Sequence, residues 1–134
     1  MIRVLLDSCT CIELLRGRAP RVRRRLEKLA PDQAAISCIT LAELQYGAAK
    51  SSDPARHAEL LAKFCAPLSI LPFDSVASTT YGRVRRELER QGTPIGPLDT
   101  LIAAHALSLN LMLITGNLGE FSRVRGLCVK DWQG

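Results

Sequence analysis

The sequence predicts an α/β fold: an α/β/α sandwich around a mainly parallel sheet of four to five strands. Short apolar runs such as Leu111–Ile114 are typical of strands that are buried on both faces. Segments with apolar residues at helical spacing separate these runs, which is the pattern of folds that alternate strand and helix. Polar residues follow several of the runs, at the sheet edge where binding sites form in such folds.

The first part of the chain is expected to begin with the strand Ile2–Leu6, followed by a short helix. Pro20 is a favoured first helical residue. Val22, Leu26 and Leu29 then recur at spacings of four and three, so this second helix is amphipathic and carries arginines on its outer face.

The second strand is expected at Ala34–Ile39. Thr40 and Glu43 have the spacing of a capping box, in which each side chain hydrogen-bonds the other residue's backbone. A helix should therefore begin at Thr40 and run to about Lys50, and a further helix should begin at Pro54.

The third strand is expected at Ser69–Phe73, and Asp74 should open a long helix that ends at Gln91-Gly92. Another helix follows Pro97, with apolar residues at a spacing that predicts extensive burial. Asp99 lies where its N-cap is expected.

The fourth strand, Leu111–Ile114, should lead into a short acidic loop, Asn117–Glu120. Leu127–Val129 is expected to form a last edge strand, and Trp132 to anchor the end of the chain.

The composition fits one globular domain spanning residues 1–134, with 47% hydrophobic and 23% charged residues. No apolar run reaches membrane-spanning length and no signal peptide opens the chain, so we expect a cytoplasmic protein with no membrane partner. The net charge of +5 is compatible with a polyanionic partner, although a solvated helix face is the favoured interpretation of any single run of arginines. The arginines form two clusters: Arg16, Arg18, Arg21, Arg23, Arg24 and Arg25, then Arg83, Arg85, Arg86 and Arg90.

The five cysteines form no CxxC pair, and none has a partner at zinc-finger spacing. A redox or zinc protein is therefore disfavoured, and most of the cysteines are expected to be small buried residues. His57 and His105 have no serine or cysteine partner nearby in sequence, so we expect packed or otherwise satisfied histidines.

Polar residues from distant parts of the chain are expected to meet at one edge of the sheet. Asp7, Ser37 and Asn117 lie at or just past strand ends, Glu43 lies one turn into a helix, and Asp99 opens another. Taken singly, Asp7, Glu43 and Asp99 could be helix caps. Taken together, they would repel each other unless a cation such as Mg²⁺ or Mn²⁺ lay between them.

Four motifs resemble those of the PIN-domain ribonucleases known as VapC-type toxins, in order and spacing over almost the whole chain: Val4–Ser8, Ile36–Gly47, Ile95–Ala106 and Ile114–Asn117 with Glu120-Phe121. The resemblance implies a PIN-like sandwich and a metal-dependent endoribonuclease, the toxin half of a bacterial toxin–antitoxin pair. It also implies a homodimer whose acidic sites a cognate antitoxin blocks.

By this match, Asp7, Glu43 and Asp99 are the metal-binding acids, with Asn117 among the catalytic residues. Supporting roles fall to Ser8, Ser37, Thr115 and Glu120, and RNA contacts to the two arginine clusters. Two departures stand out: Cys9 replaces an amide of the first motif, and Asn117 stands where many relatives carry an aspartate.

The expected activity is cleavage of structured RNA by water that the metal activates, and the resemblance points to tRNA, with the initiator tRNA anticodon loop as the first candidate. The alternative is a catalytically weak nucleic-acid-binding module that keeps the PIN fold. The Cys9 and Asn117 departures motivate this alternative.

Overall fold

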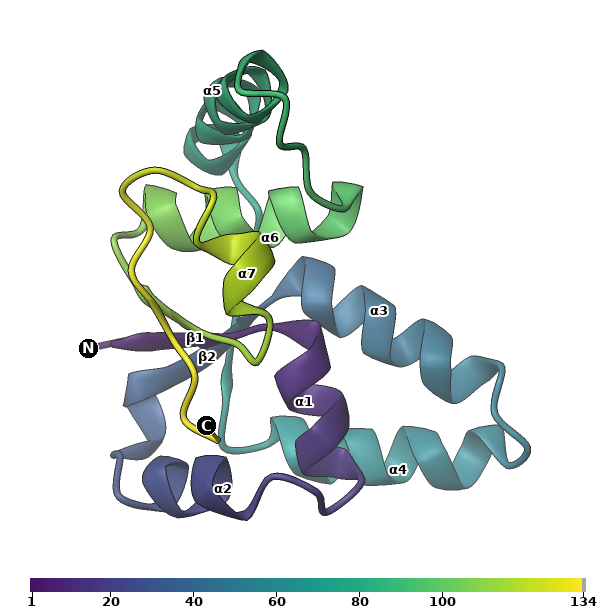
Figure 1. The fold of residues 1–134 in the computed structure, drawn as a ribbon. Helices are drawn as coiled ribbons and strands as arrows, with labels where there is room; N and C mark the ends of the chain where they lie inside the picture. The colour runs from purple at the N-terminus through teal and green to yellow at the C-terminus, as the bar shows by residue number, and fades with distance from the viewer. Residues whose placement is uncertain (134) are drawn as a thin grey trace.

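The computed structural model describes residues 1–133 and has a five-stranded sheet with helices on both faces (Figure 1). All neighbouring strands run parallel, which confirms the predicted α/β sandwich. The elements are β1 (Val4–Leu6), α1 (Ser8–Leu15), α2 (Pro20–Glu27), the 3-10 turn η1 (Pro31–Gln33), β2 (Ala34–Ser37), α3 (Cys38–Ala49), α4 (Pro54–Cys65), β3 (Ser69–Leu71), α5 (Ser75–Arg90), α6 (Pro97–Ser108), β4 (Met112–Ile114), α7 (Leu118–Phe121) and β5 (Val129–Lys130).

The strand order is β3-β2-β1-β4-β5. From β1 the chain adds β2 and β3 on one side and β4 and β5 on the other, so the direction of winding reverses between β1 and β4. Leu6 of β1 is paired with Ile114 of β4 at this point. In open parallel sheets a ligand crevice forms beyond the carboxyl ends of the strands at such a reversal.

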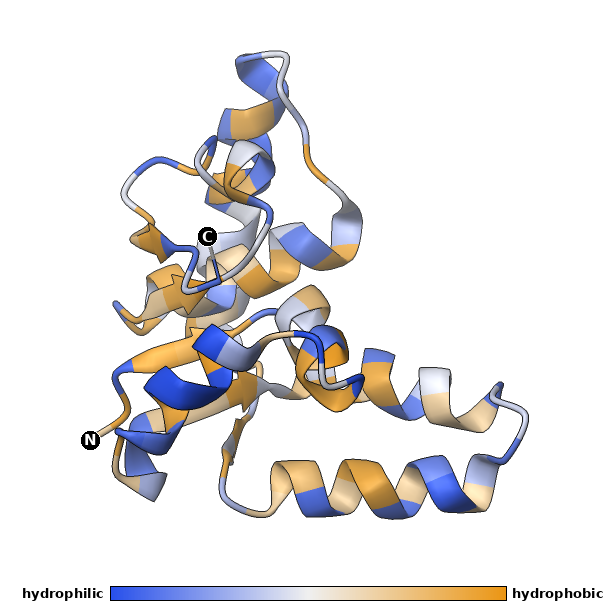
Figure 2. Cartoon of the chain, turned by 60° about the horizontal axis from the view of Figure 1, so that its bottom comes forward, coloured by the Kyte–Doolittle hydropathy of each residue, from blue (hydrophilic) through white to orange (hydrophobic). Residues whose placement is uncertain are grey.

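Alternate residues of β1 face two separate cores. Leu5 is fully buried against α5 and α6, together with Leu113 of β4. Val4 and Leu6 point to the opposite face, which α1, α2 and α4 cover. This period of two is expected for a strand, and the burial of both sets explains why β1 is apolar throughout (Figure 2).

Helices α3 and α4 form an antiparallel pair that extends away from the sheet, while α5 lies across α6 on the other side (Figure 1). Because α4 rests largely on α3, only a narrow stripe of it is buried, with Leu61 at its centre. Leu60, Val76 and Leu98 follow an apolar helical pattern but are 46%, 59% and 44% exposed.

Four strands are shorter or shifted by one to two residues relative to the sequence prediction: β1 begins at Val4, β3 ends at Leu71, β4 begins at Met112 and β5 spans Val129–Lys130. Two helices also differ from it. Helix α3 begins at Cys38, with Ser37 as its N-cap, so Cys38 and Ile39 are helical and no capping box forms at Thr40. The expected acidic loop after β4 contains the short helix α7, which Asn117 caps. Apolar runs of this length are compatible with either strand or helix, which accounts for the error at the start of α3. Within residues 1–133, no helix has the length and apolar character to cross a bilayer.

Candidate active site

Asp7 lies at the carboxyl end of β1, beside the point where the winding reverses. Its side chain is 1% exposed. Oδ1 accepts a hydrogen bond from the backbone N–H of Thr10 at 2.8 Å, and Asp7 is thereby the N-cap of α1. Oδ2 accepts from the Thr115 hydroxyl at 2.6 Å. Asp7 is therefore a cap, and its second oxygen is fixed at the sheet edge by a residue 108 positions away.

Glu43 lies within α3, where it caps nothing. Its Oε1 accepts a hydrogen bond from the hydroxyl of Ser8 at 2.5 Å, and Ser8 also approaches the buried Thr40 hydroxyl at 3.4 Å. Because Ser8 directly follows Asp7 in the chain, this bond places the Glu43 carboxylate beside the start of α1. The serine that sequence analysis assigned a supporting role thus orients one of the acids.

Asp99 lies in the first turn of α6, but Gly96 is the N-cap, so the predicted capping role of Asp99 is wrong. Proline at the first helical position, Pro97, fixes this start. The backbone N–H of Gly96 donates to Glu120 Oε1 at 2.7 Å. A Cβ placed on Gly96 would lie 3.6 Å from Glu120 Oε1 and 3.7 Å from Asp99 Oδ2, so both carboxylates flank this glycine.

The four carboxylates act on one another electrostatically. The pKa of Asp99 is raised to about 6, first by burial and then by the negative charges of Glu120, Asp7 and Glu43, in that order. The Cys9 thiol borders the same group: burial raises its pKa first, and the same acids contribute after it. Acids from β1, α3, α6 and α7 thus share one small region of negative charge.

A divalent cation would neutralise this charge. Within residues 1–133, no three acidic, histidine or cysteine side chains close into a cage that could hold a metal unaided. Mg²⁺ does not need such a cage, since it commonly takes one or two carboxylates and keeps several waters. A half-buried Asp99 with a raised pKa and three acidic neighbours fits that mode of binding.

Asn117 and Ser37 serve the site differently from each other. The amide nitrogen of Asn117 donates to the Glu120 carboxylate, and its backbone N–H donates to the Thr115 hydroxyl at 2.9 Å. The Ser37 hydroxyl instead accepts from the N–H of Ile39 and pairs with His105 Nδ1 at 2.8 Å. Asn117 therefore belongs to the acidic group as a positioning residue, whereas Ser37 fixes α3 to α6.

The histidines and cysteines follow their expected chemistry in part. His105 is 1% exposed, satisfied by Ser37, and its pKa is lowered by burial, as a packed histidine requires. All five cysteines are free thiols, but of the five only Cys11 is buried, so the expectation that most would be buried is wrong.

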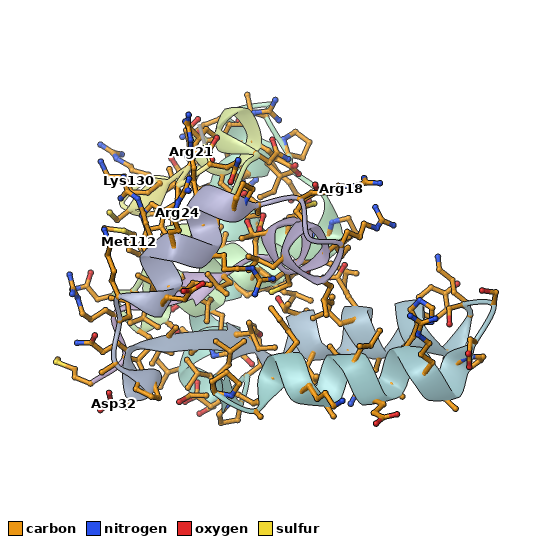
Figure 3. The ribbon with its side chains drawn as sticks, turned by 90° about the horizontal axis from the view of Figure 1, so that it is seen from below. Arg18, Arg21, Arg24, Asp32, Met112 and Lys130 are labelled. Atoms are coloured by element: carbon orange, nitrogen blue, oxygen red, sulfur yellow. The ribbon has the colours of Figure 1, made fainter. Side chains whose placement is uncertain are left out.

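The first arginine cluster lies on and around α2, which is mainly hydrophilic (Figure 2). Arg21 and Arg24 project on the same face as Lys130, and Arg18 projects apart from them (Figure 3). Arg23 is partly occupied, because its Nη2 donates to the Leu14 carbonyl at 3.1 Å. Arg16 and Arg25 are also exposed, with Arg25 stacked on the Trp132 ring at 5.7 Å.

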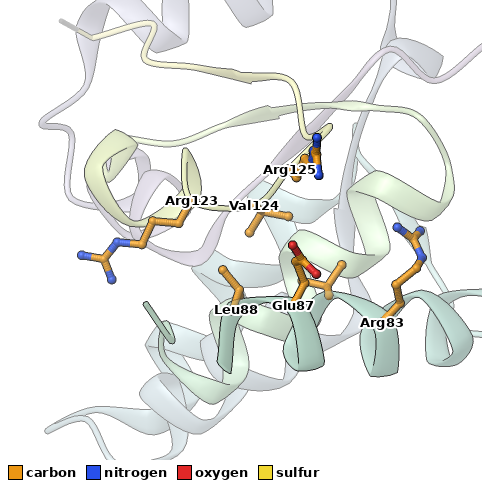
Figure 4. A pocket seen from close by; sticks show the side chains of 7 residues that line it. Arg83, Glu87, Leu88, Arg123, Val124 and Arg125 are labelled. Atoms are coloured by element: carbon orange, nitrogen blue, oxygen red, sulfur yellow. The ribbon is translucent and has the colours of Figure 1, made fainter. Parts of the chain in front are cut away.

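The second cluster includes two arginines that sequence analysis missed. Arg83 of α5 lines a cavity of about 250 Å³ with Arg123 and Arg125, which follow α7 (Figure 4). Arg123 lies 40 residues after Arg83 in the sequence, and the two meet only in the folded chain. Their spacing in the sequence therefore does not predict that they lie together. Arg86 is exposed, while Arg85 is bonded to Tyr81 and Glu89 on its own helix.

Replacing Thr115 with valine should lower the free energy of unfolding by about 1–3 kcal/mol, because the buried Asp7 oxygen would lose its donor. Thr80→Val is the matched control. The Thr80 hydroxyl donates only to the Val76 carbonyl of its own helix, and that carbonyl keeps its backbone hydrogen bond in the variant. Loss of the Thr80 hydroxyl should therefore cost about 0.5 kcal/mol or less. Urea unfolding measures both, and equal losses would contradict the role given to Thr115.

Comparisons with known proteins agree with this geometry. The family model "PIN domain" matches residues 4–127. The chain is 41% identical over 132 residues to the "tRNA(fMet)-specific endonuclease VapC" of Salmonella typhimurium, covering 98% of this chain and 99% of that protein. It is 38% identical over 129 residues to "Ribonuclease VapC2" of Rickettsia felis, covering 96% of each.

Solved structures give the same result. The chain in the crystal structure of DNA-bound VapBC from Salmonella typhimurium superposes with a TM-score of 0.94 at 40% identity, covering 98% of this chain and 99% of that one. VapBC-1 of nontypeable Haemophilus influenzae gives a TM-score of 0.91 at 35% identity over the full length of both chains.

Proposed function

The chain belongs to the PIN-domain family, among its VapC ribonucleases, and from this premise we propose that it is a divalent-metal-dependent endoribonuclease that cleaves structured RNA. The observation that carries the proposal is the meeting of four carboxylates at the reversal point of the sheet, with the pKa of Asp99 raised to about 6. If these acids served only as helix caps, bringing their like charges together would raise the free energy of the folded state with no compensating role.

Asp7, Glu43 and Asp99 would hold the Mg²⁺ or Mn²⁺ ion. The bound ion would lower the pKa of water and stabilise negative charge on the phosphodiester. The protein's own contribution is to fix the acids: Thr115 holds Asp7, Ser8 holds Glu43, and Asn117 with the Gly96 N–H holds Glu120. Such outer hydrogen bonds orient ligands and commonly matter nearly as much as the ligands themselves.

Glu120 contributes more to this site than its supporting place in the sequence motif indicates. Among the charges that raise the pKa of Asp99, that of Glu120 is the largest. We therefore propose that Glu120 would help Asp99 to hold the ion, since both carboxylates flank Gly96. The amide of Asn117 allows this arrangement, because it donates to Glu120 where an aspartate would repel it.

The proposed substrate is a tRNA cut in its anticodon loop, with initiator tRNA as the first candidate. The name of the Salmonella relative, a tRNA(fMet)-specific endonuclease, supports this choice. Exposed arginines on α2 and α5 suit a folded polyanion, and the chain has only six aromatic residues with which to stack an extended single strand.

The proposed partners are a cognate antitoxin and a second copy of the chain. Structural neighbours described as VapBC complexes support the antitoxin. A basic side chain of the antitoxin would reach the acidic site and replace the cation there. The complex would act in the cytoplasm, where its RNA substrate is found.

Mapping RNA ends after brief expression tests the function directly. We expect a few cuts in tRNA loops that leave a 5′-phosphate and a 3′-hydroxyl, because water rather than the neighbouring 2′-hydroxyl attacks. Cuts scattered along messenger RNA would contradict the substrate. Ends with 2′,3′-cyclic phosphate would contradict the reaction, and no cuts at all would favour the weak-binding alternative.

Arg18→Ala combined with Arg24→Ala should weaken binding of tRNA and reduce the slope of log K against log salt by about 1–2, because two phosphate contacts are lost. Metal binding should not change. Arg56→Ala is the control, since this arginine lies on α4, in the outlying helical pair. An equal effect from Arg56→Ala would show that only net charge matters.

A further inference from the structure

A second cavity lies next to the acidic site, between the start of α2 and the segment Asp131–Gln133. Its volume is about 270 Å³. Ala19, Val22, Ile114 and Trp132 supply apolar walls, and the charged residues Glu13, Arg18 and Asp131 also line it. Small-molecule sites commonly measure about 300–1,000 Å³, so this cavity suits one planar ring system rather than a longer ligand.

The cavity and the acidic site share a wall. Thr115 lines the cavity, and its hydroxyl donates to Asp7 Oδ2 at 2.6 Å. Cys9 lines the cavity two residues after Asp7, and its thiol is exposed to the charges of all four acids. A ligand in the cavity would therefore lie directly beside a phosphodiester held at the acids.

The walls of the cavity are already formed. Trp132 packs against the core under β1 and has the Arg25 guanidinium 5.7 Å from its ring centroid. Gln133 is fixed to α2, because its side-chain oxygen accepts from the Arg21 N–H at 3.2 Å. Trp132 and Gln133 are thus held without a ligand, which reduces the entropic cost of binding.

We propose that this cavity receives the base of the nucleotide next to the cleaved phosphodiester, with Trp132 as its contact surface. The inference rests on the proposed ribonuclease function. Each phosphate in RNA carries a base one sugar away, so a mainly apolar cavity beside the acids is where that base would fit. A strand leaving by this side would then meet Arg21, Arg24 and Lys130, whose charges match its phosphates (Figure 3).

Trp132 is the only tryptophan in the sequence, so its fluorescence reports on the cavity directly. We expect the four nucleoside 5′-monophosphates to quench it saturably, with one preferred over the others. Ribose 5-phosphate, which has the same charge and no base, should leave it unchanged. Equal quenching by ribose 5-phosphate would overturn the proposal, because binding would then need only the phosphate.

A variant that fills the cavity gives a second readout. Ala19→Leu should weaken the binding of the preferred nucleotide about 5- to 100-fold, the range expected for losing a stacked base. Gly47→Ala is the control, since a Cβ there has no heavy atom within 4 Å. Unchanged binding in Ala19→Leu would overturn the proposal, provided that both variants melt like the wild-type protein.

Cleavage of an oligonucleotide that lacks one base beside the cut site connects the cavity to the reaction. The wild-type protein should cleave it about 5- to 100-fold less efficiently than the complete RNA, and Trp132→Ala should cleave both equally slowly. Trp132→Phe, which keeps an aromatic ring, should restore the difference. If the missing base costs both proteins the same factor, the base does not contact Trp132.

These measurements separate the two proposals. Quenching by nucleotides without any RNA cleavage would reject the ribonuclease function and leave the base site standing. RNA cleavage with no response of Trp132 to nucleotides would reject the base site alone. A response to the antitoxin but not to nucleotides would assign the cavity to a protein side chain, and would equally overturn the inference.

Discussion

Asp99→Asn should reduce RNA cleavage by at least about a hundredfold, while the variant folds as well as the wild-type protein or better. The loss of activity follows if Asp99 is a metal ligand, since a neutral amide binds Mg²⁺ far more weakly than a carboxylate does. Folding should not suffer, because Gly96 rather than Asp99 caps α6. Single-turnover cleavage and thermal melting measure the two effects.

The raised pKa of Asp99 determines how the stability of the folded protein changes with pH. Its pKa of about 6 in the folded protein lies above its ordinary value of 3.8, so the folded protein binds more protons than the unfolded chain between those pH values. Wild-type stability should therefore fall as the pH rises from about 4 to about 6. Asp99→Asn should escape this loss and gain about 1 kcal/mol at pH 7, after allowing for solvent screening of a half-exposed group.

Asp53→Asn is the matched control for this variant. Asp53 caps α4, and asparagine caps a helix about as well as aspartate does, so activity and stability should both stay near wild type. Normal RNA cleavage by Asp99→Asn would reject the ligand role. A loss of cleavage in Asp53→Asn of the same size would show that the assay follows general folding damage.

Asp7→Asn should behave differently from Asp99→Asn. Both oxygens of Asp7 accept hydrogen bonds in a buried environment, so the amide would place an NH₂ group where one of them stood. We expect lost cleavage together with lost stability at this position. Glu43→Gln should keep its bond from Ser8 and lose cleavage alone.

The grouping of the acids could be predicted from the sequence, because parallel strands bring their carboxyl ends to one edge of a sheet. The helix starts were predicted less well. Asp99 and Glu43 were each assigned to a capping position, yet Pro97 and Ser37 start those helices earlier. Acids in first turns are favoured by the helix dipole whether or not they cap, so composition alone does not separate the two cases.

Contacts that join distant parts of the chain could not be predicted. Glu120 is fixed by the backbone N–H of Gly96, and a backbone donor leaves no mark in the sequence. Arg123 and Arg125 meet Arg83 only because the segment after α7 packs on α5. The cavity beside Trp132 likewise needs the end of the chain to lie on α2.

Removal of divalent metal should abolish cleavage, and Mg²⁺ or Mn²⁺ on the order of 1 mM should restore it, since only a few carboxylates hold the ion. The same ion should raise the melting temperature by several degrees, because only the folded chain gathers the acids. Full activity in excess EDTA would contradict the proposed chemistry. Restored activity without a thermal shift would contradict binding at this folded site.

The pH dependence of metal binding ties the ion to Asp99. A proton on this carboxyl competes with the metal, so with a pKa of about 6 the affinity should be about tenfold weaker at pH 5 than at pH 7. Calorimetry at the two pH values measures the ratio of the affinities.

Asp53→Asn should keep this ratio, since Asp53 lies outside the site. Asp99→Asn should bind weakly at both values and lose most of the ratio, because the carboxyl whose proton competes with the metal is gone. A tenfold ratio that survives in Asp99→Asn would assign the competing proton to another group and remove Asp99 from the ion.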